Sequence, residues 1–130
     1  MELFDLKGKT ALVTGGGSGL GHGYSVNLAK AGAYVFVFGR KEEPLRKTVE
    51  EICNAGGQAE VCIGDITDLK SIEETVRNIV NKKGHLDILV NNAGTEIAEP
   101  VFEVTEEHFD TIMSVNIKGT YMMAREAARY

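Results

Sequence analysis

The sequence predicts a doubly wound α/β fold, in which helices cover both faces of a parallel sheet. Short β-branched runs alternate with longer segments whose apolar residues recur at helical spacing. A glycine-rich segment follows the first run, and small or polar residues follow each later run. Because strands that alternate with helices form parallel sheets, these observations favour this class over an all-helical or an antiparallel one.

Four runs are predicted to be strands. Residues 10–14 and 34–38 form compact runs rich in apolar side chains, which is typical of strands that are buried on both faces. Residues 59–63 alternate between aliphatic side chains and Glu or Cys. Residues 86–90 form the fourth run, which ends at an Asn-Asn-Ala-Gly segment. Residues that favour turns thus mark the ends of the predicted strands.

The segments between these strands are predicted to be helices. The first, over residues 20–31, ends before Gly32, as helix C-termini commonly do. Apolar residues recur at helical spacing over 45–53 and again over 69–80. The second of these periods follows Thr67-Asp68, which is a suitable N-cap.

The last part of the chain is also predicted to be helical. Thr105 is a good N-cap because acidic residues follow it in the first turn, where the helix dipole is positive. Val104 and Phe109 have the spacing of a hydrophobic staple. Residues 117–130 favour a helix up to the last residue and contain no stop signal.

Right-handed crossovers leave few arrangements of these elements. We predict the strand order 3-2-1-4, with the switch point between the first and fourth strands. This is the first half of a Rossmann-type doubly wound parallel sheet, plus the helix that follows it. Residues 1–130 contain no repeat, linker or low-complexity segment, so we expect one domain or part of one.

Composition and charge exclude several classes of protein. The chain of 130 residues has 14 basic and 19 acidic residues and a formal net charge of −5, which argues against a non-specific nucleic-acid binder. It contains no apolar stretch of membrane-spanning length and begins without a signal-peptide pattern, so we expect no membrane partner and a cytoplasmic location. Its two cysteines and three histidines lack metal-ligand spacing, so we expect no metal site.

The glycine-rich segment after the first strand predicts a phosphate-binding loop. Gly15, Gly19 and Gly21 fit the pattern G-x-x-x-G-x-G, whereas neither G-x-G-x-x-G nor the Walker pattern is present. Glycine at these positions permits a sharp turn, a close approach of the backbone to a pyrophosphate, and tight packing of helix on strand. A merely tight turn is the alternative interpretation.

The residues after the second strand indicate the type of dinucleotide. Sites specific for NAD place an acidic residue there, which binds the ribose hydroxyls. This sequence has Gly39, which leaves room, and Arg40, whose planar guanidinium suits a 2′-phosphate. We therefore favour NADP(H) over NAD(H). The alternative is a solvated arginine at the start of a helix.

Two further segments follow the third and fourth strands. Asp65 offers an acceptor for the amino group of adenine, and Ile66 an apolar contact for its ring. An ordinary Asx turn at Asp65 is the alternative. Asn91 and Asn92 are suited to tie neighbouring strand ends together, since asparagine side chains bond readily to backbone groups. Ala93 and Gly94 are small enough for a flat ring to lie over the backbone.

Taken together, these segments resemble those of the short-chain dehydrogenases/reductases of the classical type. The stretches 9–21, 64–68, 86–94 and 114–119 carry the resemblance, in the order and at the spacing of the family. It covers essentially the whole chain.

The resemblance implies a role for each matching residue. The glycine-rich loop would hold the dinucleotide phosphates, and Asn116 would be the asparagine of the family's Asn-Ser-Tyr-Lys tetrad. In that role Asn116 distorts its helix and binds a water of the proton relay, whereas the alternative is an ordinary polar helix residue. The cofactor-binding positions that the resemblance assigns are Gly15, Gly17, Ser18, Gly19, Leu20, Gly21, Arg40, Asp65, Ile66, Asn92, Ala93 and Gly94.

The catalytic Y-x-x-x-K motif of that family does not occur in these residues. Tyr24, Tyr34 and Tyr121 are followed four positions later by leucine, phenylalanine and arginine, and Tyr130 is the last residue. The proton donor of the family's reaction is the tyrosine, which the lysine acidifies. We therefore expect the chain to be part of a longer protein, truncated before the catalytic tyrosine and lysine, and to be inactive as a dehydrogenase by itself.

The resemblance implies an oxidoreductase that transfers a hydride between NADP(H) and a secondary alcohol or ketone. The substrate would be a small molecule, of the sugar-acid type of gluconate and deoxygluconate dehydrogenases or of the 3-oxoacyl type. We expect a homo-oligomer, either a dimer or a tetramer. One alternative is a half-Rossmann module that only binds a dinucleotide. A methyltransferase is a weaker alternative, because in methyltransferases an acidic residue usually follows the second strand, whereas this sequence has Arg40 there.

Overall fold

The computed structural model describes residues 3–130. Within them, the strands are β1 (Thr10–Thr14), β2 (Tyr34–Gly39), β3 (Gln58–Ile63) and β4 (Ile88–Val90). The α-helices are α1 (Gly19–Lys30), α2 (Glu42–Asn54), α3 (Leu69–Lys83), α4 (Glu106–Met113) and α5 (Thr120–Ala127). A short 3₁₀ helix, η1 (Val101–Glu103), precedes α4, and a π-helical segment, η2 (Ser114–Gly119), joins α4 to α5.

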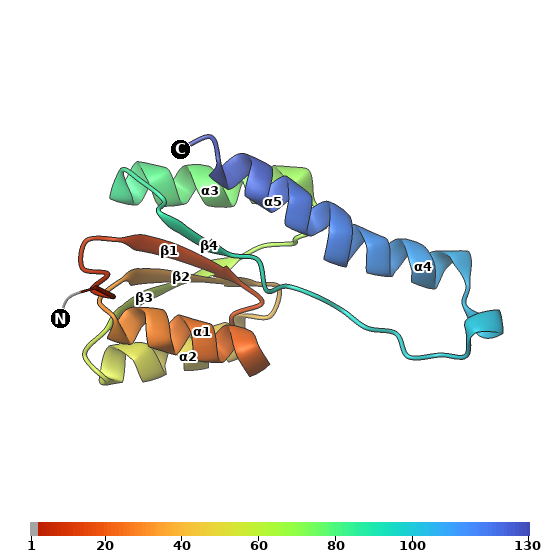
Figure 1. Cartoon of the computed structure of the whole chain (residues 1–130), viewed down its shortest axis with the longest axis horizontal. Coiled ribbons are helices and arrows are strands. Elements are labelled where there is room, and N and C mark those ends of the chain that lie inside the picture. Colours follow the sequence, from red (N-terminus) through yellow and green to blue (C-terminus); the bar gives the residue numbers. More distant parts are fainter. Residues whose placement is uncertain (1–2) are drawn as a thin grey trace.

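The strands form one parallel sheet in the order β3-β2-β1-β4, which confirms the predicted fold class and topology. Helices α1 and α2 cover one face of the sheet, and α3 and α5 cover the other (Figure 1). A long connection leads from β4 past η1 to α4, which extends beyond the carboxyl ends of the strands (Figure 1).

Alternation along the central strands divides the core into two clusters. In β1, Ala11 and Val13 pack on the side of α1 and α2, whereas Leu12 packs on the side of α3 and α5. Strand β2 continues the pattern, with Val35 and Val37 on the first side and its phenylalanines on the second. These central residues are buried on both faces, as the apolar runs predict.

The predicted N-caps of two helices are confirmed. Asp68 caps α3 by accepting a hydrogen bond from the backbone N–H of Lys70 at 3.0 Å. Thr105 caps α4 by accepting one from the backbone N–H of His108 at 3.1 Å. Because each cap fixes where a helix starts, these two residues set the bounds of the segments that border the site.

Two of the differences from the predicted boundaries have a clear physical cause. Strand β4 begins at Ile88 rather than at residue 86, because Asp87 bonds the start of β1 through both its backbone and its side chain. Helix α5 ends at Ala127 and does not continue to residue 130. The last backbone N–H groups, those of Arg129 and Tyr130, donate to carbonyls three residues earlier, so the chain tightens into a turn there.

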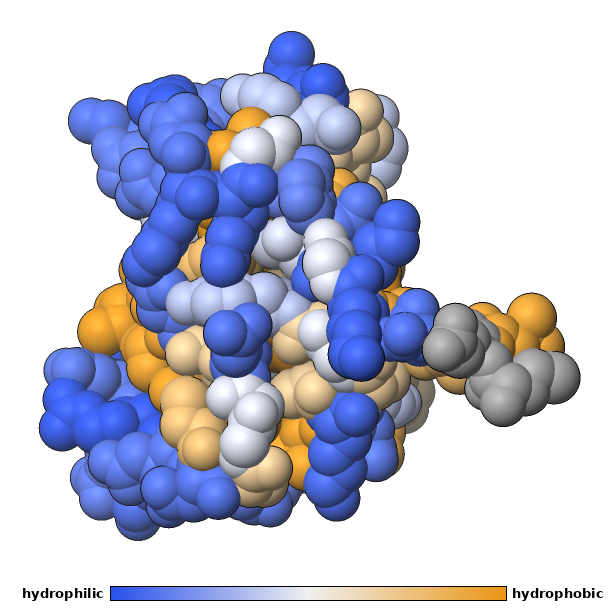
Figure 2. Space-filling view, turned by 90° about the vertical axis from the view of Figure 1, so that its left-hand side faces the viewer, coloured by the Kyte–Doolittle hydropathy of each residue, from blue (hydrophilic) through white to orange (hydrophobic). Residues whose placement is uncertain are grey.

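The end of the molecule at which the strands begin is mostly hydrophilic (Figure 2). Charged pairs lie there: Nζ of Lys9 is 4.0 Å from Asp87 beside the starts of β1 and β4, and Lys82 of α3 donates to Glu60 of β3 at 2.6 Å. No helix of the described residues has both the length and the hydropathy that crossing a membrane requires. The opposite end, where the strands finish, carries the features that the sequence singles out.

Candidate functional site

A cavity of about 860 Å³ lies at the carboxyl ends of the strands. Segments that follow all four strands line it, with Gly15 after β1, Arg40 after β2, Asp65 after β3 and Ala93 after β4. Helix α4 and the start of η2 form the opposite wall. A cavity of this size is typical of small-molecule and cofactor sites, and its place at the β1–β4 switch is where such folds bind ligands.

Packing around the glycine-rich loop explains two of its glycines. Gly15 has a φ of +63°, which favours glycine. A Cβ on Gly21 would lie 2.0 Å from the carbonyl oxygen of Gly15 and 2.5 Å from Nδ2 of Asn92, so no other residue fits there. The first turn of α1 therefore lies directly against the ends of β1 and β4.

The start of α1 is open towards the outside. Gly19 has a φ of +54°, and a Cβ placed on it would meet no atom within 4 Å. Ser18, the N-cap residue, is extended and makes no side-chain cap hydrogen bond. The first turn of α1 thus combines a helix N-terminus without a side-chain cap and a bare stretch of backbone, an arrangement that fits the phosphates of a dinucleotide.

Arg40 and Asp65 face the cavity from neighbouring strands. Asp65 accepts hydrogen bonds from the backbone N–H of Thr67 at 2.9 Å and from its hydroxyl at 2.7 Å, so the Asx turn is present. These two bonds, with a smaller contribution from the charge of Arg40, hold the pKa of Asp65 below its usual range. The turn does not remove Asp65 from the site, because the residue also lines the cavity.

The Asn-Asn-Ala-Gly segment is held against β1. Asn92 donates from Nδ2 to the carbonyl of Gly15 at 3.2 Å, which confirms the predicted tie between strand ends. Asn91 differs, because it donates to the carbonyl of Thr120 in α5. The hydroxyl of Thr14 accepts from the backbone N–H groups of Asn92 and Ala93, at 3.0 and 2.9 Å.

Asn116 lies in the π-helical segment η2, so the distortion that the resemblance implies is present. Its Oδ1 accepts from the backbone N–H of Thr95 at 2.8 Å, and its Nδ2 donates to the carbonyl of the same residue at 2.8 Å. The side chain therefore clamps the segment after β4 onto the helix at the rim of the cavity.

The model of the short chain dehydrogenase family matches residues 9–130. The chain belongs to this family. Relatives that match it include a hydroxynaphthalene reductase-like protein, Arp2, of the fungus Metarhizium guizhouense, which is 41% identical over 123 residues, covering 94% of this chain and 46% of that protein. The chain thus spans about half the length of the curated relatives that it matches.

Solved structures of short-chain dehydrogenases match over nearly the whole chain. A dehydrogenase/reductase from Sinorhizobium meliloti is 38% identical with a TM-score of 0.96, and the match covers 99% of this chain and 52% of that one. A short chain dehydrogenase from Burkholderia cenocepacia in complex with NADP is 34% identical with a TM-score of 0.92, and the match covers 97% and 52%.

The short-chain dehydrogenase fold brings together only part of the predicted set at the cavity. Ser18, Gly19 and Leu20 are exposed at the start of α1, and Gly17 lines a smaller groove between α1 and α2. Asn92 and Asn116 are half-buried and act on the backbone of the rim. The predicted residues that line the cavity itself are Gly15, Arg40, Asp65, Ile66, Ala93 and Gly94.

The sequence did not predict the contacts through which two further residues shape this site. Thr14 is predicted only as the end of the first strand and the start of the glycine-rich segment, although its hydroxyl organises the turn after β4. Thr95 holds Asn116 through backbone atoms alone. Only the position of Thr14, at the end of a strand and directly before the glycines, could have marked it. Among the described residues, no group of three or more His, Cys, Asp or Glu is arranged to hold a metal ion.

Proposed function

We propose that this chain is the NADP(H)-binding portion of an oxidoreductase that interconverts a secondary alcohol and a ketone. The observation that carries the proposal is that the segments after all four strands line the same cavity. Family membership supports the reaction class. The suggestion of a sugar-acid or 3-oxoacyl substrate stays a prediction, since it rests on the resemblance alone.

Each part of the site has a distinct task in this proposal. The bound dinucleotide supplies or accepts the hydride. The open first turn of α1 binds the phosphates through backbone N–H groups, and Asp65 and Ile66 border the adenine. Ala93 and Gly94 leave room for the adenine-side ribose. Asn116 binds a water of the proton relay, and its amide keeps the rim segment in place.

The preference for NADP(H) rests on Arg40. Its guanidinium is exposed, lines the cavity and comes directly after β2, where an acidic residue would select NAD(H). A guanidinium binds a phosphate through paired, charge-assisted hydrogen bonds, which a ribose hydroxyl cannot match. The solved relative in complex with NADP supports a dinucleotide of this kind.

Substitution of Arg40 tests the proposal. We expect Arg40→Asp to raise the Kd for NADPH at least about tenfold and to leave the Kd for NADH unchanged or lower. Fluorescence titration with both nucleotides measures the two constants. Arg77→Asp makes the same charge change at an exposed position on α3 and should leave both unchanged. Equal affinity of the Arg40 variant and the unaltered chain for NADPH would contradict the assignment.

We also propose that these 130 residues alone do not turn over substrate. Transfer of a hydride to a ketone needs a proton donor at the developing alkoxide, and the Y-x-x-x-K motif that supplies it in this family does not occur in them. Oxidation of NADPH by the pure chain in the presence of a ketone would contradict this part of the proposal.

A further inference from the structure

Packing favours the two central glycines of the loop. A Cβ on Gly16 would lie 2.4 Å from Cγ1 of Val37 in β2, and a Cβ on Gly17 would lie 2.9 Å from Cβ of Pro44 in α2. Real Cβ atoms do not approach other atoms so closely. With any other residue at either position, the loop or the side chain that it meets would have to shift, so glycine suits both positions.

This preference leaves a weak point in the backbone. The peptide that joins Gly16 to Gly17 has a glycine on each side, so it can rotate with little steric cost. Because a peptide is planar and trans, its C=O and its N–H point in opposite directions. A rotation by half a turn would therefore exchange a hydrogen-bond donor for an acceptor on the outer side of the loop.

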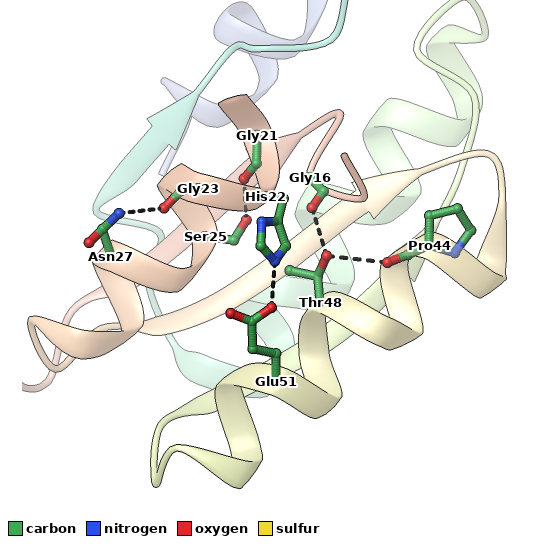
Figure 3. Close-up of polar contacts among 9 residues, drawn as sticks. All are labelled: Gly16, Gly21, His22, Gly23, Ser25, Asn27, Pro44, Thr48 and Glu51. Atoms are coloured by element: carbon green, nitrogen blue, oxygen red, sulfur yellow. Dashed lines mark hydrogen bonds and ion pairs between the residues drawn. The ribbon is translucent and has the colours of Figure 1, made fainter. Parts of the chain in front are cut away.

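A threonine of α2 fixes this peptide. The hydroxyl of Thr48 donates to the carbonyl oxygen of Gly16 at 3.2 Å (Figure 3). Thr48 is only 1% exposed, so the bond is shielded from water. The same hydroxyl lies 3.2 Å from the carbonyl of Pro44, one turn earlier in α2, so its single proton is shared between the loop and the helix.

Two other contacts hold the surroundings of this peptide. The N–H of Gly16 donates to the carbonyl of Phe38 in β2 at 3.3 Å. His22 of α1 and Glu51 of α2 form a hydrogen bond of 2.6 Å across the helices (Figure 3). Neither contact involves the peptide between Gly16 and Gly17, so Thr48 is its one side-chain bond in the described structure.

We propose that Thr48 is a positioning residue for the dinucleotide, which acts by fixing the orientation of the Gly16–Gly17 peptide. Since the carbonyl points at the buried hydroxyl, the N–H of Gly17 points away from that hydroxyl and from α2. It is then available to an anionic ligand at the loop. In the rotated form a carbonyl oxygen would face the ligand and repel its phosphates. This inference rests on the proposed binding of NADP(H).

One test needs no nucleotide. In the amide NMR spectrum of the ligand-free chain, Thr48→Val should broaden or double the signals of Gly16 and Gly17, whereas Thr48→Ser, which keeps the hydroxyl, should leave them single and sharp. Thr75→Val removes a hydroxyl from a buried position in α3 and serves as the matched control. Sharp, single loop signals in a folded Thr48→Val variant would overturn the inference.

A second test measures the effect of the Thr48 hydroxyl on the binding of NADPH. We expect Thr48→Val to raise the Kd for NADPH about fivefold to tenfold, which corresponds to the loss of one buried hydrogen bond, while Thr48→Ser and Thr75→Val remain within about twofold of the unaltered chain. A lower thermal midpoint without a change in Kd would mean that Thr48 has only a structural role, which overturns the inference. If the unaltered chain fails to bind NADPH, the proposed function fails, and the NMR test still decides the orientation of the peptide.

Discussion

At the scale of single residues, the site depends on hydroxyl and amide groups that bond backbone atoms of distant segments. Thr14 is the clearest case, because it is fully buried and its hydroxyl serves three backbone groups. It accepts from two N–H groups of the turn after β4 and donates to the carbonyl of Val90 at 3.4 Å. This one side chain joins the ends of the two strands on either side of the switch point.

We expect Thr14→Val to destabilise the chain by about 2–4 kcal/mol, because two half-buried N–H groups would lose their acceptor. Thr14→Ser keeps the oxygen. Apart from the stability that is lost with the buried methyl group, it should lower the free energy of unfolding by less than about 1 kcal/mol. Urea unfolding of the variants measures both effects. Equal stability of the valine and serine variants would show that the hydroxyl contributes nothing.

Prediction from sequence succeeded at this scale where a residue acts through its own conformation or size. Gly15 and Gly21 belong to this group, since their spacing carries the information. Among the side chains that bond the backbone of a remote segment, Asn92 was predicted, but Thr14 and Thr48 were not. The carbonyl that Thr48 bonds lies 32 positions away, and the N–H groups that Thr14 bonds lie 78 and 79 positions away. A backbone atom has no side-chain identity, so neither partner leaves a signal in the sequence.

At the scale of elements, Asp87 sets how β4 begins beside β1. Its side chain accepts from the backbone N–H of Thr10 at 2.8 Å and pairs with His85 at 2.7 Å, while Nζ of Lys9 lies 4.0 Å away. The hydrogen bond from Thr10 is the main cause that holds the pKa of Asp87 below its usual range, followed by the contacts with His85 and Lys9. The carboxylate form is therefore the one that stabilises the fold.

This arrangement predicts a pH dependence. A carboxyl group whose pKa is lowered by folding adds stability above its unfolded pKa of about 3.9, and that stability is lost as the pH falls through the lower, folded value. Asp87→Asn keeps an oxygen acceptor without the charge. We expect the unaltered chain to be more stable than this variant by roughly 1 kcal/mol at neutral pH, and the difference to vanish in acid. Urea unfolding of both proteins from neutral pH into acid measures it, and a constant difference would contradict the prediction.

The elements themselves were largely predictable, because apolar periodicity and caps mark strands and helices. The π-helical segment was not. Its apolar pattern is compatible with an ordinary helix, and only the resemblance implied a distortion at Asn116. The structure shows that this segment is tightly packed, since a Cβ on Gly119 would lie 2.8 Å from the carbonyl oxygen of Ile66. The backbone of η2 thus lies directly against the segment after β3.

At the scale of the whole molecule, an apolar series remains uncovered on α4, η2 and α5. It consists of side chains that recur every fourth residue and are 56%, 39%, 57% and 66% exposed: Phe109, Met113, Ile117 and Tyr121. The sequence-based expectation of a homo-oligomer stays a proposal, and this series supports it, since exposed apolar patches favour association.

We expect light scattering after gel filtration to give a mass above that of the monomer of 14.1 kDa. Phe109→Glu should shift the protein towards the monomer, because a charge would be buried in the contact. Glu73→Gln on α3, outside the series, is the control. A monomeric unaltered chain at high concentration would contradict the proposal.

The strand order also has a consequence for how the molecule folds. The connections from β1 to β2 and from β2 to β3 each lead to the neighbouring strand. The connection from β3 to β4 instead crosses the sheet, so that β4 bonds β1 across 77 positions, between Thr10 and Asp87. Contacts between distant parts of a chain form slowly, so we expect β4 to dock last. The cavity lies where β4 meets β1 and is complete only after that step. A chain that binds the dinucleotide would then have completed its folding. A folding intermediate in which the glycine-rich loop has formed but β4 has not docked would not bind the dinucleotide.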